Sequence, residues 1–104
     1  MLYIYLFSEF KGDLMETKAV AITLFGRVQQ VGFRYFVFKL ALEVGVFGFV
    51  KNQLDGSVYI EAEGEPHLVD VFVEHCKMGP PHSKVTKFSV NTIPVQNFKE
   101  FTIK

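Results

Sequence analysis

The apolar residues of this chain follow strand-like and helix-like spacings in turn, and each change of spacing marks the boundary of an element. Residues 19–25 form a continuous apolar run with β-branched members, which predicts a buried central strand. Residues 33–44 repeat at helical spacing and predict an amphipathic helix that ends at Gly45. The helix face expected to enter the core consists of Phe33, Phe36, Val37, Leu40, Ala41 and Val44.

The next segment predicts a hairpin. We expect a second strand at residues 46–52, and the Asp-Gly pair at residues 55 and 56 predicts a turn into a third strand at residues 57–63. Apolar and polar side chains alternate along the third strand, so one set is expected in the core and the other facing out. The inward set is Val58, Ile60 and Ala62, and the outward set is Tyr59, Glu61 and Glu63.

The remaining pattern predicts a second helix and two more strands. Pro66 suits a first helical turn, and the Gly-Pro-Pro sequence at residues 79–81 stops the helix. Its core face is expected to contain Leu68, Val71, Phe72, His75 and Cys76. A fourth strand is predicted at residues 83–93, and a fifth, at an edge of the sheet, at residues 97–103.

This order predicts an α+β fold, a ferredoxin-like βαββαβ sandwich with two helices on one face of a mixed, largely antiparallel sheet and an extra C-terminal edge strand. A right-handed crossover through the first helix makes strands one and two parallel, with strand three between them. Their carboxyl ends therefore lie at the same edge of the sheet. The loop at residues 26–32 and Asn52 are expected to meet there.

Composition narrows the class of protein. We expect residues 1–17 to be a poorly ordered extension and residues 18–104 to form one domain, because a polar stretch separates the apolar start from the first strand. The apolar start lacks a basic leader and is too short to span a membrane. The net charge of zero argues against a nucleic-acid partner. Cys76 is the only cysteine, so no disulfide forms within the chain, which favours the cytoplasm.

The loop between the first strand and the first helix is the candidate binding site. Arg27 and Arg34 are the only arginines of the chain, and both flank it. Main-chain N–H groups at a helix start have no intrahelical partner, and the helix dipole adds positive charge there. Arg34 lies in the first turn, where its guanidinium can contact a bound phosphoryl group. The residues expected to hold phosphate are Val28, Gln29, Gln30, Val31, Gly32, Phe33 and Arg34.

Two segments together resemble the acylphosphatase family. The sequence GRVQQVGFR at residues 26–34 matches the family's G-x-V-x-G-V-x-F-R loop at all but one fixed position. The sequence GFVKNQLDGSVYIEAEG at residues 48–64 matches its G-[aromatic]-V-x-N-x-x-x-G-x-V segment. The spacing between Arg34 and Asn52 also agrees with the family, and the resemblance covers about residues 18–104.

The resemblance implies an enzyme that hydrolyses acyl phosphates to a carboxylate and inorganic phosphate. Arg34 and Asn52 are then the catalytic residues: Arg34 binds the phosphoryl oxygens, and Asn52 orients the attacking water. Neither a metal nor a cofactor is implied. Without the resemblance, Asn52 reads as a turn residue and Arg34 as a solvated arginine at a helix start.

One position departs from the family pattern, because Gln30 stands where the family has glycine. If that backbone has a positive φ, a residue other than glycine costs about 1–2 kcal/mol. The alternative function is therefore an anion-binding ferredoxin-like module that turns over weakly or not at all. A second alternative is the acylphosphatase-like domain of larger carbamoyl-handling maturation proteins. Because those carry zinc-binding cysteines, the single cysteine here favours a free-standing enzyme.

A second apolar stripe lies opposite the core face of the first helix, formed by Tyr35, Phe38 and Leu42. We expect a monomer whose stripe either supports weak self-association, packs against the N-terminal extension, or consists of scattered surface residues.

Overall fold

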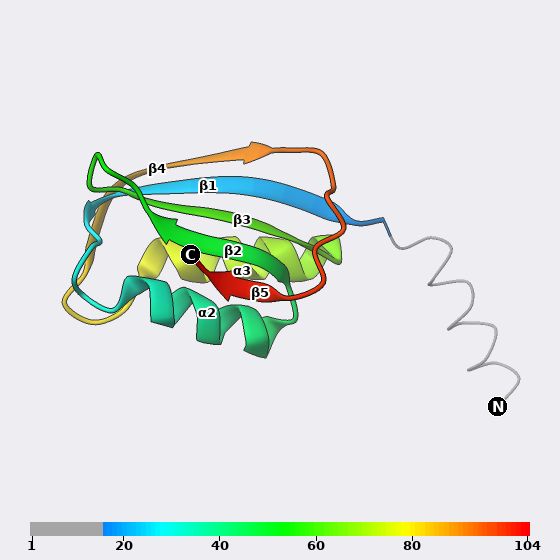
Figure 1. The fold of residues 1–104 in the computed structure, drawn as a ribbon, viewed down its shortest axis with the longest axis horizontal. Helices are drawn as coiled ribbons and strands as arrows, with labels where there is room; N and C mark the ends of the chain where they lie inside the picture. The colour runs from blue at the N-terminus through cyan, green and yellow to red at the C-terminus, as the bar shows by residue number, and fades with distance from the viewer. Residues whose placement is uncertain (1–15) are drawn as a thin grey trace, which may run out of the picture.

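The computed structural model describes residues 16–104. The extension expected at residues 1–17 therefore lies almost wholly outside the described residues. Seven elements follow one another within these described residues (Figure 1). They are β1 (Lys18–Arg27), α2 (Phe33–Val44), β2 (Phe47–Asn52), β3 (Val58–Gly64), α3 (Pro66–Met78), β4 (Lys84–Thr92) and β5 (Phe101–Ile103).

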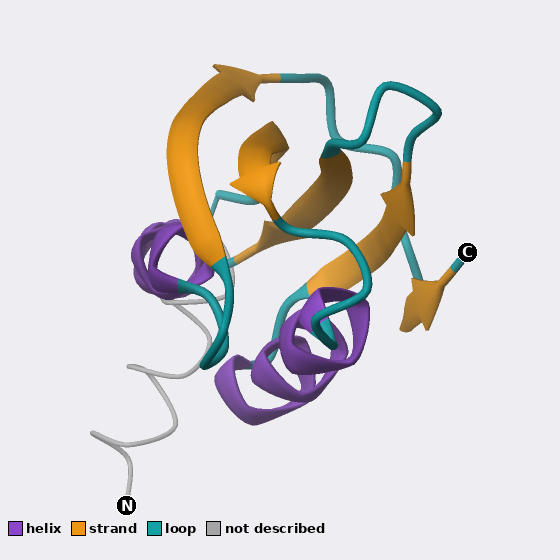
Figure 2. Cartoon of the chain, turned by 90° about the vertical axis from the view of Figure 1, so that its left-hand side faces the viewer, coloured by secondary structure: helices purple, strands orange, loops and turns teal. Residues whose placement is uncertain are grey.

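The sheet has the strand order β4-β1-β3-β2-β5. β3 pairs antiparallel with both β1 and β2, so β1 and β2 run in the same direction on either side of it. β5 lies parallel to β2 at one edge, and β4 forms the other edge. The two helices cover one face of this twisted sheet, as Figures 1 and 2 show. The predicted ferredoxin-like βαββαβ sandwich with its extra C-terminal edge strand is confirmed.

Helix α2 has the predicted bounds and the predicted inner face. Phe33, Val37 and Ala41 are buried, and Phe36, Leu40 and Val44 pack partly buried against the same core. The stripe expected on its outer side is only partly exposed. Tyr35 and Leu42 are about 60% exposed, but Phe38 is half-buried and packs against the core. The prediction of three exposed apolar residues is therefore wrong for Phe38.

Helix α3 buries Phe72 and Cys76 and packs Leu68 against the core, as the sequence predicts, but its buried face is rotated away from His75. The residues it buries are Val69, Phe72, Val73 and Cys76. His75 is exposed, and one of its ring nitrogens lies 2.9 Å from the carbonyl oxygen of Val71. The prediction was wrong for His75 because two neighbouring faces of α3 contain apolar residues at helical spacing, and packing against β1, β3 and β4 selects the buried one.

The side chains of β3 alternate as predicted, but one residue of its outward face is buried. Glu63 points away from the helices, but it is only 4% exposed. Its two carboxylate oxygens accept hydrogen bonds from the main-chain N–H groups of Gln96 and Phe98, each at 2.8 Å. The segment between β4 and β5 thus covers the end of β3. Because this segment forms the clamp around Glu63, β5 is limited to Phe101–Ile103 instead of the expected seven residues.

Within residues 16–104, neither helix has the length and apolar character that crossing a membrane requires.

Candidate active site

The β1–α2 loop, residues 28–32, leaves the sheet at the end seen face-on in Figure 2. Val28 is buried and fixes the start of the loop in the core. Gly32 caps α2 in a left-handed conformation, φ 79° and ψ 17°, and no side chain caps the helix. The first helical hydrogen bond runs from Phe36 N–H to the Gly32 carbonyl oxygen at 3.0 Å. Within residues 16–104, the N–H groups of residues 29–32 donate to no main-chain acceptor, so they are available to a ligand.

Gln30 also has a left-handed backbone, with φ 63°. This is the positive φ on which the predicted cost of a residue other than glycine depends. Gln30 is exposed and lines the pocket described below. The loop therefore keeps the glycine-type conformation although a residue with a side chain stands at this position.

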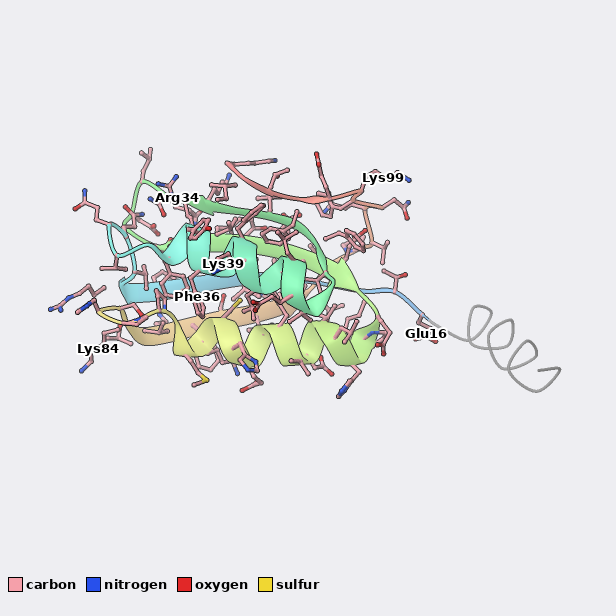
Figure 3. The ribbon with its side chains drawn as sticks, turned by 90° about the horizontal axis from the view of Figure 1, so that it is seen from below. Glu16, Arg34, Phe36, Lys39, Lys84 and Lys99 are labelled. Carbon is pink, nitrogen blue, oxygen red and sulfur yellow. The ribbon has the colours of Figure 1, made fainter. Side chains whose placement is uncertain are left out.

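A pocket of about 260 Å³ opens where the loop, α2 and the end of β2 meet. It is lined by Val28, Gln30, Gly32, Phe33, Arg34, Tyr35, Asn52 and Ile103. Arg34 and Asn52, which are far apart in the sequence, thus border one cavity, as the parallel course of β1 and β2 predicts. Figure 3 shows Arg34 at the end of the molecule where α2 begins.

The pocket has a strongly one-sided charge. Its lining includes one cation, Arg34, and no carboxylate among the described residues. Arg27, the other arginine, is exposed at the end of β1 beside Lys84 and does not line the pocket. An anion in the pocket would therefore meet a guanidinium and main-chain donors without a competing negative charge.

Two of the predicted phosphate-binding residues have other contacts. Val31 packs partly buried against the core and does not line the pocket. The Gln29 side chain turns away from the pocket to the β2–β3 turn. Its amide group donates to the carbonyl oxygens of Gln53 at 2.8 Å and Ser57 at 2.9 Å. Only the main-chain N–H groups of these two residues remain available for an anion.

The β2–β3 turn that receives Gln29 is closed by its own hydrogen bonds. Asp55 accepts from the main-chain N–H of Ser57 at 2.9 Å and from its hydroxyl at 2.6 Å. The hydrogen bonds from Ser57 lower the pKa of the Asp55 carboxyl. The Gln53 side chain donates to the Ser57 hydroxyl at 2.9 Å. Because this turn directly follows Asn52, Gln29 fixes the β1–α2 loop relative to Asn52.

The sequence reasoning missed this connection. From the sequence alone, Gln29 is expected only among the residues that hold phosphate, and residues 53–57 are expected only to form a turn. The one available signal was a glutamine among apolar loop residues, which suggests that its side chain has a hydrogen-bond partner. Its partners, the carbonyl oxygens of Gln53 and Ser57, could be named only from the structure.

The remaining reactive side chains lie elsewhere. Cys76 is fully buried, and burial raises the pKa of its thiol well above the ordinary value. None of the three histidines lines the pocket. In residues 16–104, no three or more His, Cys, Asp and Glu side chains gather in a group that could hold a metal ion.

Comparison with known proteins decides the family. The acylphosphatase family model matches residues 20–103, which include the loop, Arg34 and Asn52. The chain belongs to the acylphosphatase family. An acylphosphatase of Thermotoga petrophila is 44% identical over 87 residues, which are 84% of this chain and 97% of the relative.

Solved structures of acylphosphatases have the same fold. The crystal structure of acylphosphatase from Bacillus subtilis superimposes with a TM-score of 0.81 at 43% identity, covering 84% of this chain and 98% of that one. Full-length HypF in a phosphate- and nucleotide-bound form matches with a TM-score of 0.78 at 34% identity, and covers 88% of this chain but 12% of its own. The acylphosphatase fold of this chain thus also occurs as a small part of a much longer protein.

Proposed function

We propose that the pocket between the β1–α2 loop and β2 is where this acylphosphatase hydrolyses the carboxyl–phosphate bond of acyl phosphates. The products are a carboxylate and inorganic phosphate. The observation that carries the proposal concerns residues 16–104: among them, Arg34, Asn52 and loop amides without a main-chain acceptor border one cavity, and no carboxylate lines it.

The phosphoryl group is held by the loop and by Arg34. Main-chain N–H groups of residues 28–33 point their dipoles at an anion at the start of α2, where the helix dipole also favours negative charge. The guanidinium of Arg34 offers a planar fork of donors that binds two phosphoryl oxygens together. These fixed donors also stabilise the charge that spreads over the phosphoryl oxygens in the transition state.

The attacking water is oriented by Asn52, which is the last residue of β2 and lines the pocket. Its carboxamide can accept from and donate to the water, and so can hold it in line with the bond that breaks. The water oxygen attacks phosphorus, the bond from phosphorus to the acyl oxygen breaks, and the electron pair leaves with the carboxylate. Both hydrogens of the water end on inorganic phosphate, which exchanges them with solvent.

The nature of the leaving group explains why Arg34, Asn52 and main-chain amides are sufficient for hydrolysis, without a general acid or a nucleophilic side chain. An ordinary carboxyl group has a pKa of about 4, so the departing carboxylate is stable at neutral pH and requires no general acid. Phosphoryl transfer depends mainly on positioning and charge stabilisation, with little covalent chemistry for the protein. Neither the buried Cys76 nor any histidine is needed.

Gln30 is the reason to test a weaker alternative, an anion-binding module with little turnover. Its left-handed backbone and its position in the pocket could crowd a phosphoryl group. The relatives named acylphosphatase favour the enzyme. If Gln30 only crowds the site, Gln30→Gly raises kcat/KM several-fold from a measurable wild-type value. Turnover that is absent in the wild type and restored in Gln30→Gly would support the binding module instead.

The deciding assay is steady-state hydrolysis of acetyl phosphate, with inorganic phosphate release as the readout and a metal chelator in half of the samples. We expect saturable turnover that the chelator leaves unchanged. Loss of turnover in chelator, restored by added divalent metal, would contradict the metal-independent mechanism. Absence of turnover in both halves would contradict the activity itself.

The proposal also covers the cellular location, the oligomeric state and the partners of the enzyme. We propose a cytoplasmic monomer that binds no nucleic acid, whose residues 1–17 lie outside the catalytic domain. The single, buried cysteine suits a reducing compartment. Light scattering at rising protein concentration tests the monomer, since association through Tyr35 and Leu42 would raise the apparent mass.

A further inference from the structure

Part of the pocket is lined by residues that have no role in holding phosphate or water. Tyr35 and Ile103 border the cavity, and they are 60% and 42% exposed. Large apolar side chains that remain exposed inside a concave site are suited to contact an apolar part of a ligand. The pocket is also large for its phosphate machinery. One water occupies about 30 Å³ of liquid, so 260 Å³ leaves room for more than a phosphoryl group.

Tyr35 is held in place before any ligand binds. It follows Arg34 on α2, and its ring stacks on the ring of Phe38 with centroids 6.4 Å apart and planes 26° apart. Phe38 itself packs against the core. The Lys39 ammonium lies 5.7 Å from the Tyr35 ring centroid. With its ring braced by Phe38, Tyr35 loses little rotamer freedom when it contacts a ligand.

Ile103 is fixed by the C-terminal edge strand. It pairs with Val50 of β2, and the N–H of Lys104 donates to the Val50 carbonyl oxygen at 2.8 Å. The strand is anchored by Phe101, which is buried and meets the Phe72 ring at 6.0 Å between centroids. Ile103 therefore lies beside the strand that ends at Asn52, and β5 contributes a wall of the site.

We propose that Tyr35 and Ile103 form the subsite for the acyl substituent, and that this subsite selects acyl phosphates with an apolar, and best an aromatic, substituent. The inference rests on the proposed function, because it assigns to the substrate's other end the part of the pocket that the phosphoryl group leaves free. An aromatic substituent gains from Tyr35 through ring–ring contact and from Ile103 through burial of apolar surface.

The lining also disfavours polar substituents. No carboxylate among the described residues lines the pocket, so an amino group on the acyl carbon would find no charged partner. A polar substituent that packs against the ring of Tyr35 and the side chain of Ile103 would lose hydration there.

The test compares kcat/KM for benzoyl phosphate and acetyl phosphate in the wild type and in Tyr35→Ala, Tyr35→Phe and Ile103→Ala. Both substrates present the same phosphoryl group and lose an ordinary carboxylate, so their ratio reports on the acyl substituent. We expect the benzoyl-to-acetyl ratio to fall about fivefold in Tyr35→Ala and about threefold in Ile103→Ala. Tyr35→Phe keeps the ring and should keep the ratio.

Two controls separate the subsite from general effects. Leu42→Ala removes an apolar side chain of similar exposure from the same helix outside the pocket, and Val95→Ala does so away from α2. Both should keep the wild-type ratio. An unchanged ratio in Tyr35→Ala and Ile103→Ala, with acetyl phosphate turned over normally by the wild type, would overturn the subsite while leaving the proposed function intact. Absence of turnover of both substrates by the wild type would overturn the proposed function.

Discussion

Both ends of the sheet have main-chain N–H groups that lie outside regular secondary structure and need an acceptor, and the two ends differ in whether the protein supplies one. At the end where α2 begins, the main-chain N–H groups of residues 29–32 have no main-chain acceptor within residues 16–104. At the other end, two main-chain N–H groups of the β4–β5 segment, those of Gln96 and Phe98, bind the carboxylate of Glu63. Figure 3 shows the two ends through Arg34 and Lys99, which lie near opposite ends of the folded domain.

Hydrogen bonds from main-chain N–H groups to an anion can therefore serve either ligand binding or stability of the fold. At the far end the protein supplies its own anion, and Glu63 is almost completely buried with both oxygens bonded. At the site end the main-chain donors have no main-chain acceptor, the Arg34 guanidinium belongs to the same pocket, and none of the carboxylates in the described part of the chain lines it. Filled donors stabilise the fold, whereas open donors are available to a substrate.

The largest expected effect is on activity at the open end. Asn52→Ala should lower kcat for acetyl phosphate by about 10²–10³-fold, because it removes the group that orients the water. Asn91→Ala, a matched change at an exposed asparagine of β4, should leave kcat unchanged. The measurement is steady-state phosphate release, with urea unfolding to verify the fold. An Asn52→Ala enzyme with near-normal kcat would remove water positioning from the mechanism.

The filled end should show its effect in stability. Glu63→Ala leaves two buried N–H groups without their acceptor, and should lower the free energy of unfolding by about 2–3 kcal/mol. Activity per folded molecule should stay at the wild-type level. The matched control is Glu61→Ala on the same face of β3, where the carboxylate accepts from Tyr59 and Gln96 side chains near solvent and the expected loss is below about 1 kcal/mol.

Equal losses of unfolding free energy in Glu63→Ala and Glu61→Ala would mean that the buried clamp is no stronger than an exposed contact. The contrast between the two ends would then fail on its stability side.

A third substitution, at Gln29, should lower both stability and activity, because its hydrogen bonds hold the β1–α2 loop to the β2–β3 turn. Gln29→Met keeps the side-chain volume but removes both hydrogen bonds to the β2–β3 turn. We expect a loss of about 1–2 kcal/mol in unfolding free energy. Because the loop is then less well fixed relative to Asn52, kcat/KM should fall about tenfold. Unfolding curves and steady-state kinetics on one preparation measure both, and a variant with lower stability but unchanged kcat/KM would make the tether purely structural.

The smallest effect concerns the backbone. Gln30 at the open end and Asn97 at the filled end both have left-handed conformations, with φ 63° and 61°. Replacing Gln30 with glycine relieves about 1–2 kcal/mol of strain, while the flexibility of glycine returns about 0.5–1 kcal/mol. The net gain should be below about 1 kcal/mol, and smaller still for Asn97→Gly, because asparagine tolerates this conformation. Urea unfolding of both variants measures it, and destabilisation by Gln30→Gly would contradict the strain.

Local sequence patterns predicted most of the fold. The period of apolar residues gave α2 with correct bounds and each strand within a few residues, because these elements bury one face against a single core. The juxtaposition of Arg34 and Asn52 followed from strand direction alone. The glycine-bearing loop and its arginines led to the proposed anion site, and the family resemblance led to the role that we propose for Asn52.

The errors came from contacts between distant segments. Alternation placed Glu63 on the outer face correctly, but only the β4–β5 segment, folded over that face, buries it. The turn partners of Gln29 lie 24 and 28 residues away along the chain, beyond the reach of any local pattern. Helix α3 carries apolar residues on two neighbouring faces, so the choice of the buried face depended on its packing partners.

The central claim is that one guanidinium, that of Arg34, holds the phosphoryl group at the open end of the sheet. The most direct measurement compares kcat/KM for acetyl phosphate in Arg34→Ala and Arg27→Ala, which remove the two arginines of the chain one at a time. We predict a loss of at least about 10²-fold in Arg34→Ala and a near-wild-type value in Arg27→Ala. An Arg34→Ala enzyme that keeps most of its kcat/KM, or an equal loss in both variants, would contradict the claim.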